Sequence, residues 1–235
     1  MGMDYQVKSP VRIWLSLIIR MSLFTIAIIW PAGTWRWWEA WVLVSIWTGY
    51  AIVMTHYLLR HDPALLAERL RLLPFHKEQK NWDKVIMLLF FVAGVAIYIV
   101  PGFDVMRYSW SEPLPLWMRI VALLAHLPCM VFLGWVMHVN TYLAQVVRID
   151  KARGHKVITT GPYSWVRHPM YSAVIILLFA TPVALGSRYT LVPAIFLIML
   201  LIIRTILEDR TLHNELEGYP EYAEKTRYRL VPWIW

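Results

Sequence analysis

Long apolar segments, separated by short polar ones, dominate the chain. Each is close to the roughly 20 residues that an α-helix needs to cross the ~30 Å hydrocarbon layer of a membrane. A lipid-embedded helix satisfies its backbone hydrogen bonds internally. The pattern therefore predicts an all-α integral membrane protein with about six transmembrane helices, at residues 12–30, 38–59, 84–101, 117–137, 170–186 and 189–206.

The composition agrees with this fold class. Of the 235 residues, 59% are hydrophobic and 16% are charged, whereas a soluble domain carries about a quarter charged residues. The first apolar segment lacks a small-residue cleavage site, so we expect a retained helix rather than a signal peptide. The single cysteine, Cys129, predicts no internal disulfide, and no spacing typical of a metal site is present.

The net charge of +8 is explained by membrane topology rather than by nucleic-acid binding. Lysine and arginine collect in cytoplasmic segments of membrane proteins. Most of them lie before the first helix and in the three segments 60–84, 148–167 and 204–229; the other connecting segments hold only Arg36, Arg107, Arg119 and Arg188. We expect both termini and the polar segments to be cytoplasmic, at the inner or plasma membrane if the protein is bacterial.

The polar residues divide the chain into two predicted parts. Residues 1–137 comprise four transmembrane helices with an amphipathic cytoplasmic loop at 60–84, and residues 138–235 hold most of the candidate chemistry. Within the loop, a helix from about Pro63 to Leu73 would place its leucines in lipid and its arginines among the headgroups.

A candidate anion site lies at the start of the fifth predicted span. The stretch "HKVITTGPY" indicates an extended piece that closes in a Gly-Pro turn. Pro169 disfavours a helical conformation at His168 and suits the first turn of the helix that follows. The positive end of that helix beside Arg167 would attract a carboxylate or a phosphate.

Acidic residues follow the sixth predicted span. Glu208 and Asp209 lie at its cytoplasmic end, Gly218 can end the helix, and Pro220 can begin a short one that carries Tyr222 and Lys225. A ligand with both a carboxylate and cationic groups would fit between the basic turn and these acids. S-adenosylmethionine has that pattern, but the residue chemistry alone indicates only a zwitterionic or nucleotide-like ligand at a membrane interface.

The order of these motifs resembles the isoprenylcysteine carboxyl methyltransferase family, whose superfamily also includes phospholipid N-methyltransferases. The resemblance is strong across residues 140–235, and the "QKNWDK" segment before it looks like bacterial members. Asp209 stands where the family has glutamate, and Ala173 where glycine is frequent; both departures bear on the substrate. The matching residues are His155, Gly161, Pro162, Tyr163, Arg167, His168, Pro169, Tyr171, Glu208, Asp209, Leu212, Tyr219, Tyr222 and Pro232.

The resemblance implies that S-adenosylmethionine binds on the cytoplasmic side and that a lipophilic acceptor arrives laterally from the bilayer. Arg167 and Glu208 are then the candidate catalytic residues, Arg167 binding a carboxylate of the donor or acceptor. The implied cofactor-binding residues are His155, Tyr163, His168, Tyr171, Glu208 and Asp209, with Asn140 and Gln145 as further candidates. Tyrosine rings could face the sulfonium, and no metal is expected.

Several alternatives remain open from the residues themselves. Glu208 lies four residues after Arg204, which is also the spacing of an ordinary helical ion pair. Arg20, in the middle of the first span, is either functional, paired, or extended toward the headgroups. A membrane reductase of the sterol-reductase type that binds NADPH, and a non-enzymatic membrane protein, are the competing function classes. The acceptor could be a carboxylate, a thiol or an amine.

Overall fold

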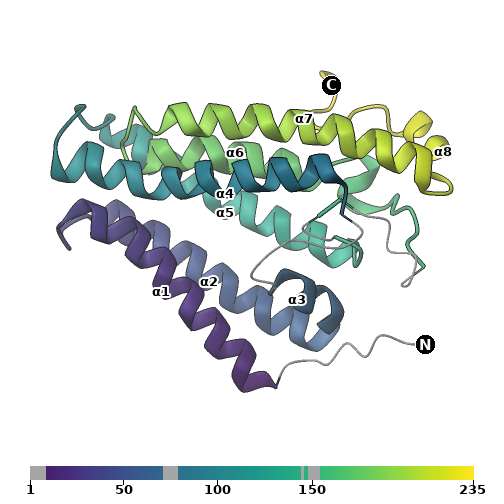
Figure 1. The fold of residues 1–235 in the computed structure, drawn as a ribbon, viewed down its shortest axis with the longest axis horizontal. Helices are drawn as coiled ribbons and strands as arrows, with labels where there is room; N and C mark the ends of the chain where they lie inside the picture. The colour runs from purple at the N-terminus through teal and green to yellow at the C-terminus, as the bar shows by residue number, and fades with distance from the viewer. Residues whose placement is uncertain (1–8, 71–78, 144–145, 148–153) are drawn as a thin grey trace.

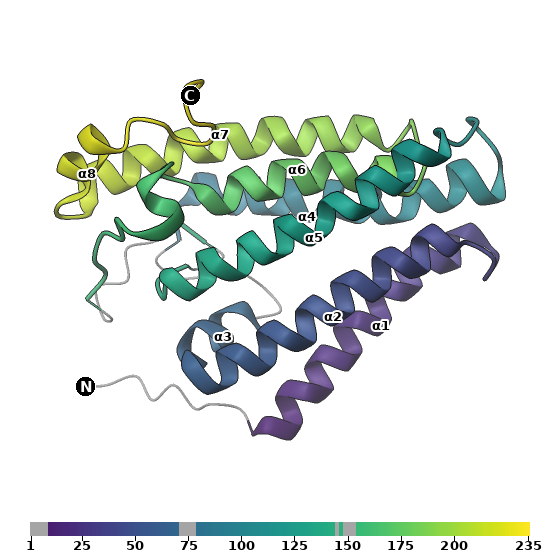
Figure 2. The same ribbon diagram turned by 180° about the vertical axis from the view of Figure 1, so that it is seen from behind.

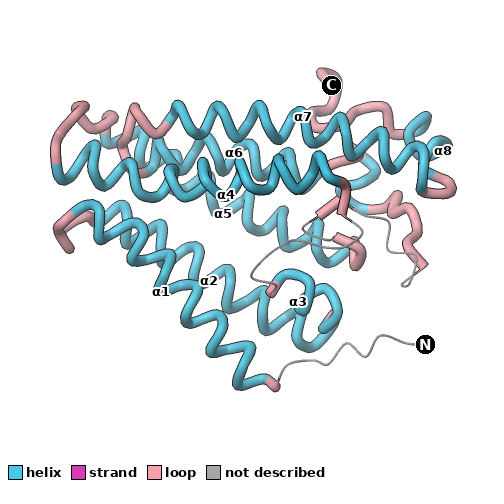
Figure 3. The backbone as a smooth tube through the Cα atoms, in the orientation of Figure 1, coloured by secondary structure: helices cyan, strands magenta, loops and turns pink. Residues whose placement is uncertain are grey.

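The protein is described from a computed structural model that covers residues 9–70, 79–143, 146–147 and 154–235. Within these ranges the chain forms helices and loops, without a β-strand (Figure 3). The helices are α1 (Pro10–Ala32), α2 (Trp38–His61), α3 (Pro63–Arg69), α4 (Asn81–Pro101), the π-helix η1 (Gly102–Arg107), α5 (Leu116–Val139), the 3₁₀-helix η3 (Gly161–Ser164), α6 (Pro169–Ala184), α7 (Leu191–Glu215) and α8 (Tyr219–Lys225).

Helices α4, α5, α6 and α7 form a bundle, and α1 and α2 form a hairpin that slants away from it (Figure 1, Figure 2). The hairpin meets the bundle at one end, where Ile28, Leu43 and Leu185 share a buried apolar cluster. The opposite end, at which α2 ends and α4 and α6 begin, also carries α3 and α8. We call it the site end, because the polar residues singled out above gather there.

Among the described residues, five helices are long and apolar enough to cross a membrane: Pro10–Ala32, Trp38–His61, Asn81–Arg107, Leu116–Val139 and Leu191–Glu215. Their exposed residues include Val11, Phe91 and Val131, which suit contact with lipid chains. The sixth predicted span is the apolar helix α6, which has only 16 residues. At about 1.5 Å per residue such a helix is only ~24 Å long, shorter than the hydrocarbon layer. The all-α membrane fold is confirmed, with five spans supported by length instead of six.

The prediction that the leucines of the amphipathic helix α3 face lipid is wrong. Leu65, Leu66 and Leu70 are buried against Ile13 and Leu58 of the α1–α2 hairpin, so they face protein instead of lipid. The α3 helix starts at Pro63, as expected, with Asp62 accepting a hydrogen bond from the Leu65 amide at 2.9 Å. A short amphipathic sequence shows which face is apolar, but not whether lipid or protein covers that face.

Arg20 has a protein partner in the middle of α1. Its guanidinium donates to the carbonyl oxygens of Leu70 at 2.5 Å and Arg69 at 3.4 Å, at the C-terminal end of α3. Carbonyl groups at a helix end lack intrahelical partners and carry a partial negative charge. Arg20 therefore anchors α3 to α1. Of the three alternatives predicted for this residue, the structure supports pairing within the protein.

The junction of α4 and η1 packs unusually closely on α1. A Cβ on Gly102 would lie 2.7 Å from the Ala32 nitrogen and 2.9 Å from the Pro31 Cβ. We expect Gly102→Ala to destabilise the protein by about 1–3 kcal/mol, because one helix must move to admit the methyl group. Thermal unfolding in detergent measures this, with Gly94→Ala as the control, since a Cβ there meets nothing within 4 Å. Equal melting temperatures for the two variants would contradict the prediction.

Candidate functional site

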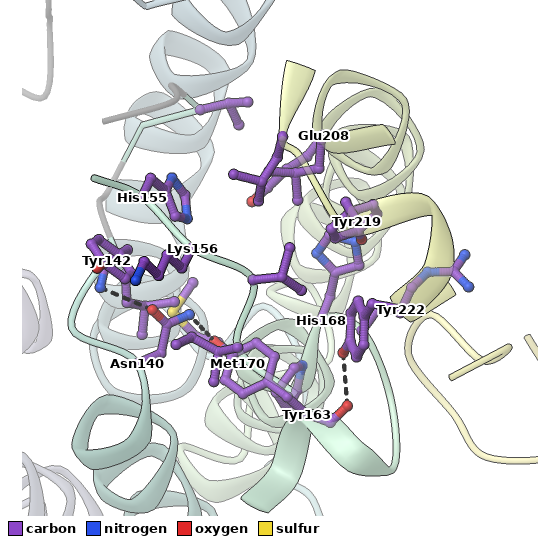
Figure 4. Close-up of a pocket in the computed structure, with 18 of the residues that line it drawn as sticks. Asn140, Tyr142, His155, Lys156, Tyr163, His168, Met170, Glu208, Tyr219 and Tyr222 are labelled. Carbon is purple, nitrogen blue, oxygen red and sulfur yellow. Dashed lines mark hydrogen bonds between the residues drawn. The ribbon is translucent and has the colours of Figure 1, made fainter. Parts of the chain in front are cut away.

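A cavity opens at the site end, between the segment that follows α5 and the ends of α6, α7 and α8 that lie there (Figure 4). The space between these walls, counted together with the open solvent at the mouth, is about 770 Å³. Of the residues predicted from the sequence, His155, Tyr163, Arg167, His168, Tyr171 and Glu208 line the cavity. Asp209 is absent from the lining, and Gln145 lies outside the described residues.

Local backbone geometry turns the chain from the cavity wall into α6. Gly161 has a φ of +60°, a left-handed conformation that glycine adopts without steric cost. It opens η3, in which Pro162 and Tyr163 are buried. Helix α6 begins at Pro169, and His168 before it is non-helical with φ −125° and ψ 61°. The predicted Gly-Pro turn and proline-started helix are confirmed, and together they place Tyr163, His168 and Tyr171 on one wall.

The C-terminal helix α8 completes this wall. Gly218, with a φ of +79°, precedes α8, and Pro220 lies in its first turn, as the sequence predicts. The Tyr222 hydroxyl donates to the Tyr163 carbonyl oxygen at 2.7 Å, and the Asn140 side-chain amide donates to the Tyr163 hydroxyl at 2.7 Å. Burial raises the pKa of the Tyr163 phenol above its ordinary value, so this hydroxyl stays protonated in the physiological range.

Glu208 presents a carboxylate to the cavity from α7. Its side chain is half-buried, and its Oε2 accepts a hydrogen bond from the Tyr171 hydroxyl at 2.5 Å. The His168 ring lies parallel to the Tyr171 ring, with centroids 5.7 Å apart. The cavity therefore offers one acidic group flanked by aromatic rings, a combination that suits a ligand cation.

Asp209 lies behind the wall and binds basic and phenolic groups from three segments. It accepts both arms of the Arg167 guanidinium, at 2.8 and 2.9 Å, together with the Tyr219 hydroxyl at 2.8 Å and Arg229 Nε at 2.9 Å. His168 Nε2 lies 3.3 Å from the same carboxylate. These contacts connect α7 to the start of α6, to α8 and to the C-terminal tail. The Asp209 side chain is buried, with only 9% of it exposed.

Arg167 is engaged almost entirely within the protein. Besides Asp209, its Nη1 donates to the carbonyl oxygens of Thr226 and Arg227, each at 2.9 Å. Its backbone amide donates to the Tyr228 carbonyl and that of His168 to the Arg229 carbonyl. The basic turn and the acidic helix end thus meet directly at Arg167 and Asp209, while Glu208 faces the open space beside them.

The opposite wall comes from the segment after α5. Tyr142 and His155 stack with centroids 4.7 Å apart, and Figure 4 shows them with Lys156 and Asn140 across from His168, Glu208 and Tyr219. Tyr142 and Lys156 were not among the candidates predicted from the sequence. Neither lies in a recognisable motif, and only the folded loop brings them to the cavity.

One comparison with known proteins bears on this site. Residues 120–214 match the model of the isoprenylcysteine carboxyl methyltransferase (ICMT) family. The matched range runs from α5 through η3 and α6 to the end of α7, and so includes most of the cavity wall. No match was found among the curated proteins with which the chain was compared.

Proposed function

We propose that this chain, which belongs to the isoprenylcysteine carboxyl methyltransferase family through its residues 120–214, transfers a methyl group from S-adenosylmethionine to a lipophilic acceptor. Its family and its apolar helices make it a membrane methyltransferase. The observation that carries the finer proposal is the cavity in which the Glu208 carboxylate lies among tyrosine and histidine side chains.

The residues that line the cavity suit the chemistry of the donor. Glu208 would bind the ammonium or ribose hydroxyl groups, and the Tyr171 ring would favour the sulfonium. Across the cavity, His155 and Tyr142 would hold the adenine by stacking, and Lys156 would bind the donor carboxylate. When bound, S-adenosylmethionine supplies a methyl carbon that is already activated by the sulfonium.

The protein's own contribution is positioning and the exclusion of water. Oriented reactants can gain about 7–11 kcal/mol over free encounter in solution, and a carboxylate or thiolate acceptor reacts faster after desolvation. Tyr163, protonated because its pKa is raised by burial, can donate a hydrogen bond without accepting the methyl group itself. Arg167 and Asp209 bind each other and fix the part of the cavity wall that carries His168. We therefore propose that they position this wall and do not bind the ligand themselves.

Orientation in the membrane follows from the charge pattern. Among the described residues, lysines and arginines lie at the site end around α3, at Lys156 and around α8. Segments that carry these residues favour the cytoplasmic side, so we propose that the cavity opens to the cytoplasm and that the acceptor arrives from the surrounding lipid.

Titration of the purified protein in detergent with S-adenosylmethionine tests the donor. We expect saturable binding by calorimetry and no comparable binding of NADPH. Binding of NADPH but not of S-adenosylmethionine would favour the sterol-reductase alternative and overturn the proposal. Binding of neither ligand would also overturn it.

The acceptor is identified by incubating membranes that contain the protein with methyl-labelled S-adenosylmethionine. We expect label in the lipid extract that is lost when Glu208 is replaced by glutamine. Release of labelled methanol by mild base would indicate a methyl ester and hence a carboxylate acceptor. Base-stable label would indicate a thioether or a methylated amine. Label in lipid that is equal with and without the protein would contradict methyl transfer.

A further inference from the structure

A second buried acid lies just outside the cavity, at the start of α4. Asp83 is fully buried, and its carboxylate accepts hydrogen bonds from the Gln79 side chain at 2.9 Å and the Val147 backbone amide at 3.0 Å. Val147 lines the cavity, so one oxygen of Asp83 is hydrogen-bonded directly to a cavity residue. Nothing in the proposed chemistry uses this acid.

The other oxygen of Asp83 binds Arg204. Arg204 Nε lies 2.9 Å from Asp83 Oδ1, and both side chains are buried, at 8% and 0% exposure. The guanidinium carbon of Arg204 lies 5.6 Å from the centre of the Tyr171 ring, and the Tyr171 hydroxyl binds Glu208. A buried pair of opposite charges thus lies directly behind the aromatic ring that is proposed to face the sulfonium.

We propose that Asp83 is a positioning residue that neutralises Arg204 and so preserves the site's preference for the cationic donor over its uncharged product. This inference rests on the proposed function. S-adenosylmethionine carries a sulfonium, whereas S-adenosylhomocysteine, which remains after methyl transfer, carries a neutral thioether. The two ligands share every other group, so their relative affinity reports the electrostatic potential at the sulfur.

The sign of the effect follows from the pair. With both charges present, Asp83 and Arg204 largely cancel at the sulfur, and the neighbouring Glu208 favours the sulfonium. Without the Asp83 carboxylate, Arg204 keeps its interaction with Glu208, but one negative charge is lost and the potential at the sulfur becomes more positive. Unit charges roughly 10 Å apart, at an effective dielectric constant of about 20, change an affinity by on the order of tenfold. Without Arg204, the Asp83 carboxylate is uncompensated and the preference moves the other way.

Charges packed around the pair bear on this balance. Arg69, at the end of α3, lies near Arg204 and Tyr171 and contacts the Met170 sulfur at 3.5 Å. It remains in place in every variant considered, so it adds a constant background to the potential. Only the balance between Asp83 and Arg204 changes.

Calorimetric titration of the full-length protein with each ligand separately tests the proposal. We expect Asp83→Asn to lower the preference for S-adenosylmethionine over S-adenosylhomocysteine by on the order of tenfold. Arg204→Gln should raise the preference, and the double variant should return it toward the wild-type value. Asp83→Glu, which keeps the charge, should leave it close to wild type.

Asp104→Asn is the matched control. Asp104 is also fully buried and accepts a hydrogen bond from Ser187 at 2.6 Å, but it lies in η1, at the end of the bundle away from the cavity. Its replacement should lower stability without changing the relative affinity of the two ligands. A merely structural role for Asp83 would give the same result as this control.

Two outcomes separate this inference from the proposed function. If the wild-type protein binds neither ligand, the proposed function fails. If it binds both and the preference moves in the same direction, or not at all, in Asp83→Asn and Arg204→Gln, the role of Asp83 is wrong and the donor assignment stands. If Asp83→Asn does not fold, the other two variants test the role of Asp83. The preference for S-adenosylmethionine over S-adenosylhomocysteine should rise in Arg204→Gln and stay close to the wild-type value in Asp83→Glu.

Discussion

Replacement of Asp209 by asparagine is expected to lower the free energy of unfolding by about 3–5 kcal/mol, the usual cost of removing one partner from a buried ion pair. The cost is high because asparagine has no charge and keeps only one of the two oxygens that bind Arg167, whose guanidinium remains buried, with 7% of its side chain exposed. Tyr219 and Arg229, which bind different oxygens of Asp209, would then compete with Arg167 for the single oxygen that remains. The C-terminal tail and α8 should therefore loosen together.

Thermal unfolding in detergent, followed by tryptophan fluorescence, measures the loss, and limited proteolysis shows whether it begins in the C-terminal segment. Glu208→Gln is the matched control, because it removes the neighbouring carboxylate from the same helix. Asp209→Glu tests whether the shorter acid is required at this position. If Asp209→Asn melts at the same temperature as Glu208→Gln, the carboxylate is not the anchor that its contacts indicate.

The helices are predictable because membrane crossing imposes both length and composition on them. The boundaries of Trp38–His61 and Leu116–Val139 differ from the sequence prediction by only a few residues. The short helix α6 was predicted as a span because its apolar composition continues past its end into Leu185. Whether a segment can cross the membrane depends on the length of its helix. That length is set by where the chain turns, which the apolar composition does not show.

The cavity wall follows from motifs whose backbone requirements are local. Glycine at 161 and proline at 169 determine a turn and a helix start wherever the chain is packed, so His168 and Tyr171 could be placed correctly in advance. The partners of Asp209 could not, because Arg167 lies 42 residues earlier in the chain. Two adjacent acids on a helix point in different directions, and the sequence does not show that Glu208 faces the cavity and Asp209 faces the protein.

The long-range contacts of arginine show the same limit. Arg20 binds carbonyl oxygens 49 and 50 residues away, and Arg204 binds Asp83 across 121 residues. From the sequence, Arg204 is equally suited to pair with Glu208 one turn later. In the structure Arg204 binds Asp83 at 2.9 Å and also interacts electrostatically with Glu208, so the nearby acid in the sequence does not reveal the distant one.

Glutamine in place of Glu208 is expected to weaken S-adenosylmethionine binding by about 10- to 150-fold, the equivalent of the 1.5–3 kcal/mol that a hydrogen bond to a charged group contributes. The loss should be selective. Glu208 is half-buried and has one short contact, to Tyr171, which a glutamine oxygen can still accept. The melting temperature should therefore stay close to that of the wild type.

Calorimetry with both ligands distinguishes this role from that of Asp83. The ammonium and ribose groups proposed to bind Glu208 are present in S-adenosylmethionine and in S-adenosylhomocysteine, so both affinities should fall. The loss should be larger for S-adenosylmethionine, because its sulfonium also loses a nearby negative charge, whereas Asp83→Asn should leave the affinity for S-adenosylhomocysteine close to that of the wild type. Glu215→Gln is the control, because Glu215 is on the same helix but pairs with Lys80 at the surface. Unchanged affinity in Glu208→Gln, or an equal loss in Glu215→Gln, would remove Glu208 from the donor site and with it the feature on which the proposed function depends.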